Sequence, residues 1–385
     1  MRAFAAHITH RLATTTRSLT TMSSSATAAK LSRMQRWFPT TANPLIVSAP
    51  MAGVTNPKLA SEVVRAKGLG FIQGGRTFKP DSPALAQLEE QLSLTRSLLP
   101  TENTEESLLP VGVGFVLFSD CAARYFAETT APILARHRPA AVWLFAPDPD
   151  RPDTLRRVIE ALRVAASDWN PRVVVQVGTV AAAREAAELG ADVIVAQGAE
   201  AGGHQFVRAA GVVSLVPEVR DMVRVEFPSK EIAVWAAGGI ADGRGVAAAL
   251  ALGAEAAVLG TRYMVTPESD AEDYKRQALL AASDGATSTV KSYVHDHVQS
   301  NFTWPTLYDA RALVHQSYHD DLAGMEIAEN EARYKVAKKK GDVSIMVTWS
   351  GSSVGLIKSA PPAAEITKQV RDEAVGVIEG LKASL

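Results

Sequence analysis

A histidine that directly follows two glycines is the residue best placed in this 385-residue chain to do acid–base chemistry. His204 comes after Gly202 and Gly203, between two stretches of apolar sequence. An imidazole takes up and releases a proton near neutral pH, as general base catalysis requires. The glycines beside it would let a ligand approach the backbone closely. A lone loop histidine can also be purely structural, so the hypothesis depends on the elements that position it.

Two further glycine-rich loops indicate a phosphate-binding site. One contains Gly238 and Gly239 within the stretch AAGGIADGRG, and the other is Gly260-Thr261-Arg262. Backbone N–H groups at the start of a helix bind phosphate, and the helix dipole assists them. Tight turns without a ligand are the alternative interpretation of the same glycines.

The elements that must carry these loops alternate regularly from residue 44. Short runs rich in Val, Ile and Ala predict strands, and the stretches between them, rich in Ala, Leu, Glu and Arg, predict helices. The runs are apolar throughout, as expected of strands covered on both faces. We place strands at Leu45–Ser48, Gly70–Gly74, Val111–Val116, Ala141–Phe145, Val173–Val177, Val193–Gln197, Ala233–Ala237 and Ala256–Gly260. We place helices at 57–67, 84–98, 121–136, 151–165, 179–189, 242–252 and 268–282, with a long loop and a short segment near 212–225 after the sixth strand.

Eight such units over about 240 residues predict a (β/α)8 barrel, with an open doubly wound sheet as the alternative. In a barrel the active site lies at the carboxyl ends of the strands, and phosphate sites commonly use the loops after strands seven and eight. His204 follows the sixth predicted strand, Gly238 the seventh and Gly260 the eighth. The barrel would therefore bring all three loops to one mouth.

The alternation of predicted strands and helices ends near residue 285. We therefore expect the chain to have three parts. Residues 1–40 form a disordered leader, 41–285 the barrel, and 286–385 a smaller, mainly helical cap on the barrel mouth. Within the cap, 320–341 predicts one amphipathic helix and 362–382 a last helix. Phe302, Trp304 and Tyr308 in the cap could line the pocket or pack between cap and barrel. His295 and His297 would face the same side of a strand and could bind a metal as a pair, but no third ligand with suitable spacing is evident, and a polar loop at the rim of the cap is the favoured interpretation.

The leader has the composition of a mitochondrial transit peptide. It is rich in Ser and Thr, no acidic residue precedes Glu62, and its basic residues are Arg2, Arg11, Arg17, Lys30, Arg33 and Arg36. A disordered leader without a targeting role, or a true start at Met22, are the alternatives. We therefore expect a mitochondrial or cytoplasmic protein.

Composition excludes several classes of function. The formal net charge of -1 gives no basic surface for nucleic acid. With Cys121 as the single cysteine, neither an intrachain disulfide nor a thiolate metal cluster can form, and we expect an intracellular protein without a metal site. No run of 18 apolar residues occurs, so we expect no membrane span.

Four motifs resemble those of the nitronate monooxygenase family, once called 2-nitropropane dioxygenases. The motifs are Gln197–His204, Ala237–Gly245 with Leu259–Arg262, the early Ser48–Gly53, and the late Trp349–Gly355. They occur in the family's order, and the resemblance runs from about residue 44 to about residue 380 in a barrel-like spacing.

The resemblance implies an FMN-containing barrel that oxidises alkyl nitronates with molecular oxygen to a carbonyl compound and nitrite. Carried over, His204 is the base that takes the α-proton of a neutral nitroalkane. Pro50, Met51 and Ala52 lie against the isoalloxazine ring, and Gly202 and Gly203 approach the flavin. The resemblance assigns the phosphate to Ala237, Gly238, Gly239, Gly260 and Thr261, and the ring or ribityl chain to Gln176 and Gln197.

The sequence departs from a common family pattern in two places. Many members carry Lys where Gln176 stands, and a Gly-Val-Asn stretch where this chain reads Gly112-Val113-Gly114. A lysine near the ring would favour the reduced, anionic flavin. Its replacement leaves open how this flavin is tuned and which substrate is preferred.

Three other functions remain compatible with the sequence. An FMN-dependent enoyl thioester reductase would use NAD(P)H, although no G-x-G-x-x-G dinucleotide motif is present. A flavin-free phosphate-binding lyase or isomerase would need other catalytic groups, and no predicted strand contains a lysine for Schiff-base chemistry. A non-catalytic binding protein would keep only the scaffold. In the favoured interpretation the partners are a small nitronate and O2, and the protein is a monomer or a homodimer.

Overall fold

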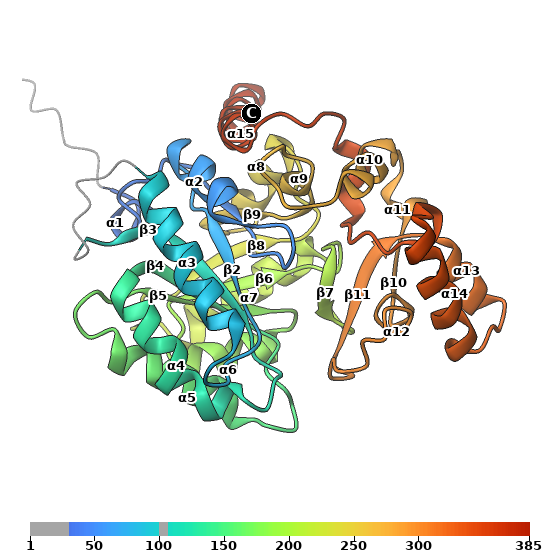
Figure 1. Ribbon diagram of the computed structural model, residues 1–385. Helices are drawn as coiled ribbons and strands as arrows, with labels where there is room; N and C mark the ends of the chain where they lie inside the picture. Colours follow the sequence, from blue (N-terminus) through green and yellow to red (C-terminus); the bar gives the residue numbers. More distant parts are fainter. Residues whose placement is uncertain (1–30, 100–106) are drawn as a thin grey trace, which may run out of the picture. The chain divides into compact units, whose positions relative to one another are not determined.

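Eight parallel strands form the centre of the fold in the computed structural model, which describes residues 31–99 and 107–385. The strands lie side by side in the order β1, β9, β8, β6, β5, β4, β3, β2 (Figure 1). Their bounds are β1 Leu45–Ser48, β2 Phe71–Gly75, β3 Leu109–Val116, β4 Pro139–Phe145, β5 Arg172–Val177, β6 Val193–Gln197, β8 Ala233–Ala237 and β9 Ala256–Leu259. Each of the eight predicted strands is present, with ends that differ by at most two residues.

The sheet closes between its first and last strands. Val47 of β1 forms a parallel bridge with Leu69, two residues before β2. The N–H of Ser48 donates to the carbonyl of Leu69 at 3.1 Å, and the N–H of Leu69 to that of Ile46 at 2.9 Å. These bonds join the two edges of the sheet, and the (β/α)8 barrel predicted from the sequence is confirmed.

Alternate residues of each strand face the barrel interior and the surrounding helices, because side chains alternate across a strand. The interior holds two fully buried tryptophans, Trp143 and Trp235, with small and branched neighbours. Apolar residues thus occupy both faces of every strand, which explains the uninterrupted apolar runs of the sequence.

The short helix α1 (Arg33–Trp37) packs against this interior. Met34 and Phe38 are buried, and the indole N–H of Trp235 contacts the sulfur of Met34 at 3.3 Å. These residues fall within the part of the chain expected to be a leader, so packed structure begins before residue 40. Residues 1–30, which carry most of the expected leader, lie outside the described residues.

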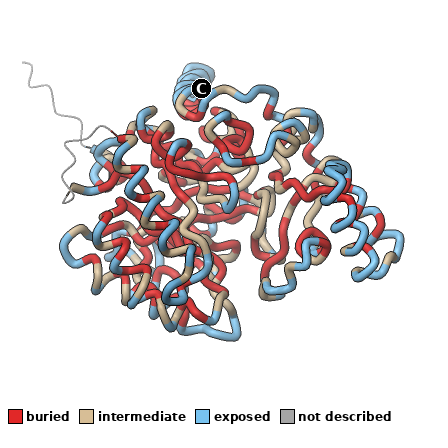
Figure 2. Tube along the Cα trace, viewed as in Figure 1, coloured by how far each residue is buried: buried red, intermediate tan, exposed pale blue. Residues whose placement is uncertain are grey.

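Helices surround the barrel in the predicted order, α2 Pro57–Arg65, α3 Pro83–Leu98, α4 Ala122–His137, α5 Asp153–Ala165, α6 Val180–Glu188, α7 Val212–Glu226 and α8 Gly243–Ala251. Their inner faces are buried and their outer faces exposed (Figure 2). The segment near 212–225, expected to be short, is a full helix of 15 residues.

The last helix completes this layer. α15 (Ala363–Ser384) packs between α8 and α2, and its buried Ile366, Val370 and Ala374 join the core that surrounds the strands. Its Arg371 donates to the backbone carbonyls of Pro44, Ala66 and Lys67 at 3.3, 2.8 and 2.8 Å. The C-terminal part of the expected cap region is therefore barrel wall.

The remainder of the cap combines small helices with a sheet that was not predicted. The helices of the cap are α11 Gly285–Ser288, α12 Val294–His297, α13 Gln316–Leu322 and α14 Ile327–Lys340. Two helices precede them in the part of the chain expected to be barrel, α9 Thr261–Met264 and α10 Asp273–Ala281, and α10 lies within the helix predicted at 268–282. The three antiparallel strands run in the order β10 (Thr289–Ser292), β11 (Tyr308–Leu313) and β7 (Gly203–Phe206). β7 belongs to the loop after β6, so the barrel and the cap share this sheet.

The single helix predicted over 320–341 is wrong. Gly324 adopts a φ of 86°, a left-handed conformation that ends α13, and α14 begins three residues later. Within the described residues, no helix has the length and apolar character required to cross a membrane.

Candidate active site

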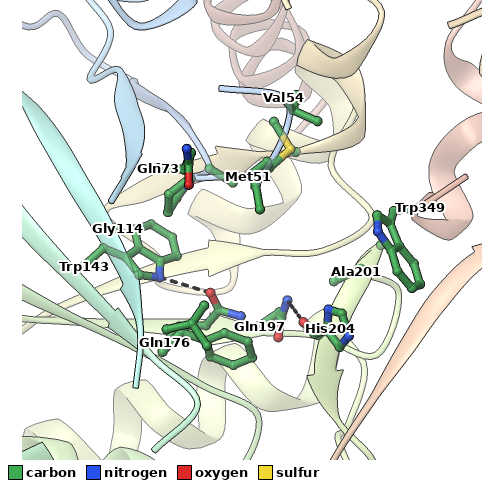
Figure 3. Close-up of a pocket in the computed structure, with 18 of the residues that line it drawn as sticks. Met51, Val54, Gln73, Gly114, Trp143, Gln176, Gln197, Ala201, His204 and Trp349 are labelled. Carbon is green, nitrogen blue, oxygen red and sulfur yellow. Dashed lines mark hydrogen bonds between the residues drawn. The ribbon is translucent and has the colours of Figure 1, made fainter. Parts of the chain in front are cut away.

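A cavity of about 920 Å³ opens at the carboxyl ends of the barrel strands. Its wall includes every predicted site residue except one: Pro50, Met51, Ala52, Gln176, Gln197, Gly202, Gly203, His204, Gly238, Gly239, Gly260 and Thr261. Ala237, the exception, is the last residue of β8 and packs inside the barrel. In Figure 3, Met51 lies on one side of the space, and Gln176, Gln197 and His204 lie on the other.

His204 stands on strand β7, where it pairs with Ala310 of β11. Its Nε2 lies 2.8 Å from Oδ2 of Asp296, and its ring stacks on Trp304 with centroids 3.7 Å apart and planes 11° apart. The ring of Trp349 also lies beside the imidazole, with the two ring centroids 5.1 Å apart. The expected base is therefore held in one orientation at the wall of the cavity.

The cap also supports the loop that carries His204. Arg311 of β11 donates to the carbonyl of Ala199 at 3.1 Å and to Oγ1 of Thr289 at 3.1 Å. Burial lowers the pKa of the Arg311 guanidinium, and the nearby carboxylates of Asp309 and Glu200 oppose that shift. The guanidinium is thus used to fix the backbone before His204.

Sequence analysis did not find Asp296. It lies in α12, 92 residues after His204, and it is the single acidic residue among the described residues that line the cavity. Its neighbours His295 and His297 do not form a metal pair. His295 bonds to His315 and to the carbonyl of Val290, whereas His297 stacks on Tyr293 and Phe302. In the sequence, Asp296 is marked only by its position between His295 and His297, and that pattern alone does not indicate an active site.

Two glutamine side chains lie at the cavity wall, and they differ in which end of the amide is already hydrogen-bonded. The indole N–H of Trp143 donates to Oε1 of Gln176 at 3.0 Å, and an indole can only donate, so the amide nitrogen of Gln176 points away from Trp143 (Figure 3). Nε2 of Gln197 donates to the carbonyl of His204 at 3.3 Å, and its Oε1 is buried without a partner among the described residues. The wall therefore offers one donor and one acceptor to a bound molecule.

The glycine loops provide backbone donors at the other end of the cavity. Gly238 and Gly239 have φ angles of 100° and 71°, and neither N–H has a partner in the described part of the chain. A Cβ at Gly238 would lie 2.8 Å from the carbonyl oxygen of Gly198. Thr261 follows Gly260 at the start of α9, and its Oγ1 accepts from the N–H of Gly351 at 2.9 Å.

Strand β3 explains one departure from the family pattern. A Cβ at Gly114 would lie 2.4 Å from Cβ of Pro50, so only glycine lets the loop after β1 approach this closely. Pro50 and Met51 can line the cavity because Gly114 has no side chain. An asparagine at this position would displace them.

These features fit a planar heterocycle that carries a phosphate. The unpartnered acceptor of Gln197 and the donor of Gln176 match a ring edge with both N–H and C=O groups. The free N–H groups of Gly238 and Gly239 match an anion. His204 lies apart from these groups, on strand β7, which pairs with strand β11 of the cap.

The chain is similar to known proteins over most of its length. A family model described as nitronate monooxygenase matches residues 159–373. A nitronate monooxygenase of Neurospora crassa is 46% identical over 92% of this chain and 95% of its own length.

Two solved structures are similar over nearly the whole chain. FabK from Thermotoga maritima has a TM-score of 0.69 and 26% identity, covering 92% of this chain and all of that one (100%). A nitroalkane oxidase from Streptomyces ansochromogenes has a TM-score of 0.67 and 27% identity, covering 91% and 100%.

Proposed function

Because the chain belongs to the nitronate monooxygenase family, we propose that it binds FMN and oxidises alkyl nitronates with molecular oxygen to carbonyl compounds and nitrite. The observation that carries the proposal is His204, held by Asp296 and Trp304 at the wall of a cavity that also offers the Gln176 donor and the Gln197 acceptor. The name of the Neurospora crassa relative and that of the Streptomyces ansochromogenes structure support the same chemistry.

We assign the cofactor to the residues that fit it. Gln176 and Gln197 would bind the ring edge, Gly238 and Gly239 the phosphate, and Met51 one side of the ring system. When bound, FMN supplies the electron acceptor for the nitronate. Gln176 contributes a neutral donor where many family members have lysine, so the side chain at this position adds no positive charge near the ring.

His204 has a task only when the substrate is a neutral nitroalkane. The histidine then takes the α-proton, and the electron pair of the broken C–H bond moves into the nitro group to form the nitronate. A preformed nitronate is already deprotonated. A positioned base contributes about 10²–10⁴-fold in rate, so the two substrate forms should differ in their need for His204 by about this factor.

The first experiment uses the full-length protein, its visible spectrum, and oxygen uptake with nitrite release on adding an alkyl nitronate. A flavin spectrum with uptake and nitrite is expected. A flavin that is bleached by NAD(P)H and does not respond to nitronate would replace the proposal by the enoyl thioester reductase. A colourless protein that does not bind added FMN would favour the flavin-free lyase or isomerase.

The His204→Asn variant tests the assignment of the base. Turnover of a neutral nitroalkane should fall by about 10²–10⁴-fold, while turnover of the preformed nitronate stays close to that of the wild type. An equal loss with both substrates would remove His204 from the role of base and leave it a role in binding the anion.

A further inference from the structure

His204 has a fixed partner that none of the four sequence motifs contains. Its Nε2 lies 2.8 Å from Oδ2 of Asp296, and the side chains are 17% and 7% exposed. We propose that Asp296 is a positioning residue that fixes the tautomer of His204, so that Nδ1 is the nitrogen that accepts the substrate proton. This inference rests on the proposed function and adds to it the atom that acts.

The carboxylate of Asp296 is itself held in place. Its Oδ1 accepts from Nδ2 of Asn301 at 2.9 Å, while Oδ2 faces His204. The backbone carbonyl of Asp296 accepts from the N–H groups of Gln299 and Asn301 at 2.9 and 3.0 Å. The loop after α12 therefore wraps around Asp296, and both carboxylate oxygens have one defined partner.

This arrangement determines which ring nitrogen carries the proton. An ionised carboxylate only accepts hydrogen bonds, so Nε2 of His204 must be the donor. In the neutral imidazole the lone pair then lies on Nδ1, for which the described residues provide no hydrogen-bond partner. The same division of roles, with a carboxylate that orients a histidine base, operates in catalytic triads.

Trp304 prevents a flip of the His204 ring that would interchange the positions of Nδ1 and Nε2. The indole is nearly parallel to the imidazole at 3.7 Å, and Trp304 in turn packs on Phe118 at 4.6 Å and on Tyr308 at 6.1 Å. Rotation of the His204 ring about its Cβ–Cγ bond would meet this packed face. The plane of the imidazole is thus set by Trp304 and its tautomer by Asp296.

Among the described residues, no other group near His204 can orient its ring in this way. The adjacent His295 donates from Nε2 to the carbonyl of Val290 at 3.0 Å, and its Nδ1 faces Nε2 of His315 at 2.9 Å. Burial lowers the pKa of both His295 and His315, which keeps the pair neutral. Arg311 is bonded to Ala199 and Thr289. Asp296 is the carboxylate available to His204 along the described cavity wall.

The proposed step is a proton transfer. The Cα–H bond of the nitroalkane breaks, a bond forms between that proton and Nδ1 of His204, and the electron pair passes into the nitro group. The imidazolium that results lies between Asp296 and the new nitronate, and both are negative. Asp296 thus also stabilises the charge that His204 gains.

The test compares Asp296→Asn with a matched control, Asp309→Asn. Asp309 is a similarly buried acid of the cap, with a side chain 10% exposed against 7% for Asp296, but it pairs with Lys291 at 3.2 Å and is not bonded to His204. In ¹⁵N NMR spectra of histidine-labelled protein, wild-type His204 should show a protonated Nε2 and a bare Nδ1. The signal is assigned by its absence in His204→Asn.

Asp296→Asn should give a mixture of the two tautomers and should lower kcat with a neutral nitroalkane by about 10²–10⁴-fold. Oxidation of the preformed nitronate should change little, and Asp296→Glu should restore part of the nitroalkane activity. Asp309→Asn should change neither the spectrum nor the ratio of the two activities. An unchanged tautomer in Asp296→Asn, or an equal loss with both substrates, would overturn the inference.

Failure of the proposed function gives a different result. If the wild type does not oxidise nitronates, the function is wrong, but the NMR spectra still decide whether Asp296 fixes the tautomer. If the wild type is active and Asp296→Asn retains the wild-type ratio of activities, the function stands and the role of Asp296 is wrong.

Discussion

Replacing Gly238 by alanine should weaken binding of the cofactor phosphate and leave binding of the flavin ring nearly unchanged. Gly238 has a φ of 100°, where an L-residue costs about 1–2 kcal/mol. The new Cβ would also lie 2.8 Å from the carbonyl oxygen of Gly198 and 3.1 Å from the N–H nitrogen of Ala201. Both neighbours are backbone, so the loops after β6 and β8 must move apart, and the N–H groups of Gly238 and Gly239 move with them.

The matched control is Gly190→Ala. Gly190 has a φ of 92°, but a Cβ there would meet no atom within 4 Å, and it does not line the cavity. Both variants should lose about 1–2 kcal/mol of unfolding free energy from the backbone conformation alone. Only Gly238→Ala should also disturb the loop that we assign to the phosphate.

The assay is quenching of flavin fluorescence on titration of the apoprotein with FMN and with riboflavin, which lacks the phosphate. Gly238→Ala should raise the Kd for FMN about tenfold or more, equivalent to about 1.4 kcal/mol, and should change the Kd for riboflavin much less. Gly190→Ala should bind both like the wild type. An unchanged preference for FMN over riboflavin in Gly238→Ala would refute the assignment of the phosphate to this loop.

Two further predictions concern stability. Arg371→Met removes the side-chain donor from the carbonyls of Pro44 and Ala66, whereas that of Lys67 still accepts from the N–H of Ala42 at 2.9 Å. The variant should lower the unfolding free energy by about 2 kcal/mol or more, at a cost of about 1–3 kcal/mol per unsatisfied carbonyl. Urea unfolding measures the loss, and the exposed Arg224→Met is the control that should change little. Burial, and then the nearby His295 and His319, lower the pKa of His315 from 6.5 to about 3. Below pH 6.5 the unfolded chain therefore binds a proton that the folded protein does not, and stability should fall by up to about 1.4 kcal/mol per pH unit towards pH 3. Urea unfolding between pH 7 and pH 4 should show this slope in the wild type and a shallower one in His315→Asn, and equal slopes would contradict it.

The barrel could be predicted because each of its strands has the same environment. A strand with other strands beside it, a packed interior on one face and helices on the other is apolar over its buried length, as Val173–Val175 and Val193–Ala196 are. The position of the site followed from the same symmetry, since loops after successive parallel strands meet at one end. No comparable rule reveals that α15 fills the place between α8 and α2, because that contact joins segments that are far apart in the sequence.

The cap was less predictable for a physical reason. β7 contains Gly203 and His204, neither of which favours a strand, and it is extended because β11 provides its hydrogen-bond partners. Asp296 is one acid within a four-residue helix, and its meaning depends on the fold that places it beside His204. Local sequence carries propensity and periodicity, whereas both of these features come from tertiary contacts.

The shared sheet connects binding and catalysis in a specific way. The barrel supplies the groups that we assign to the cofactor, and these depend on strand ends that fold with the barrel core. His204 lies in a loop of the barrel, yet β11, Asp296 and Trp304 of the cap fix its backbone, its tautomer and its plane. A disturbance of the cap should therefore impair proton abstraction before it impairs cofactor binding. Oxidation of a preformed nitronate, which needs the cofactor but no base, should be the activity that survives longest.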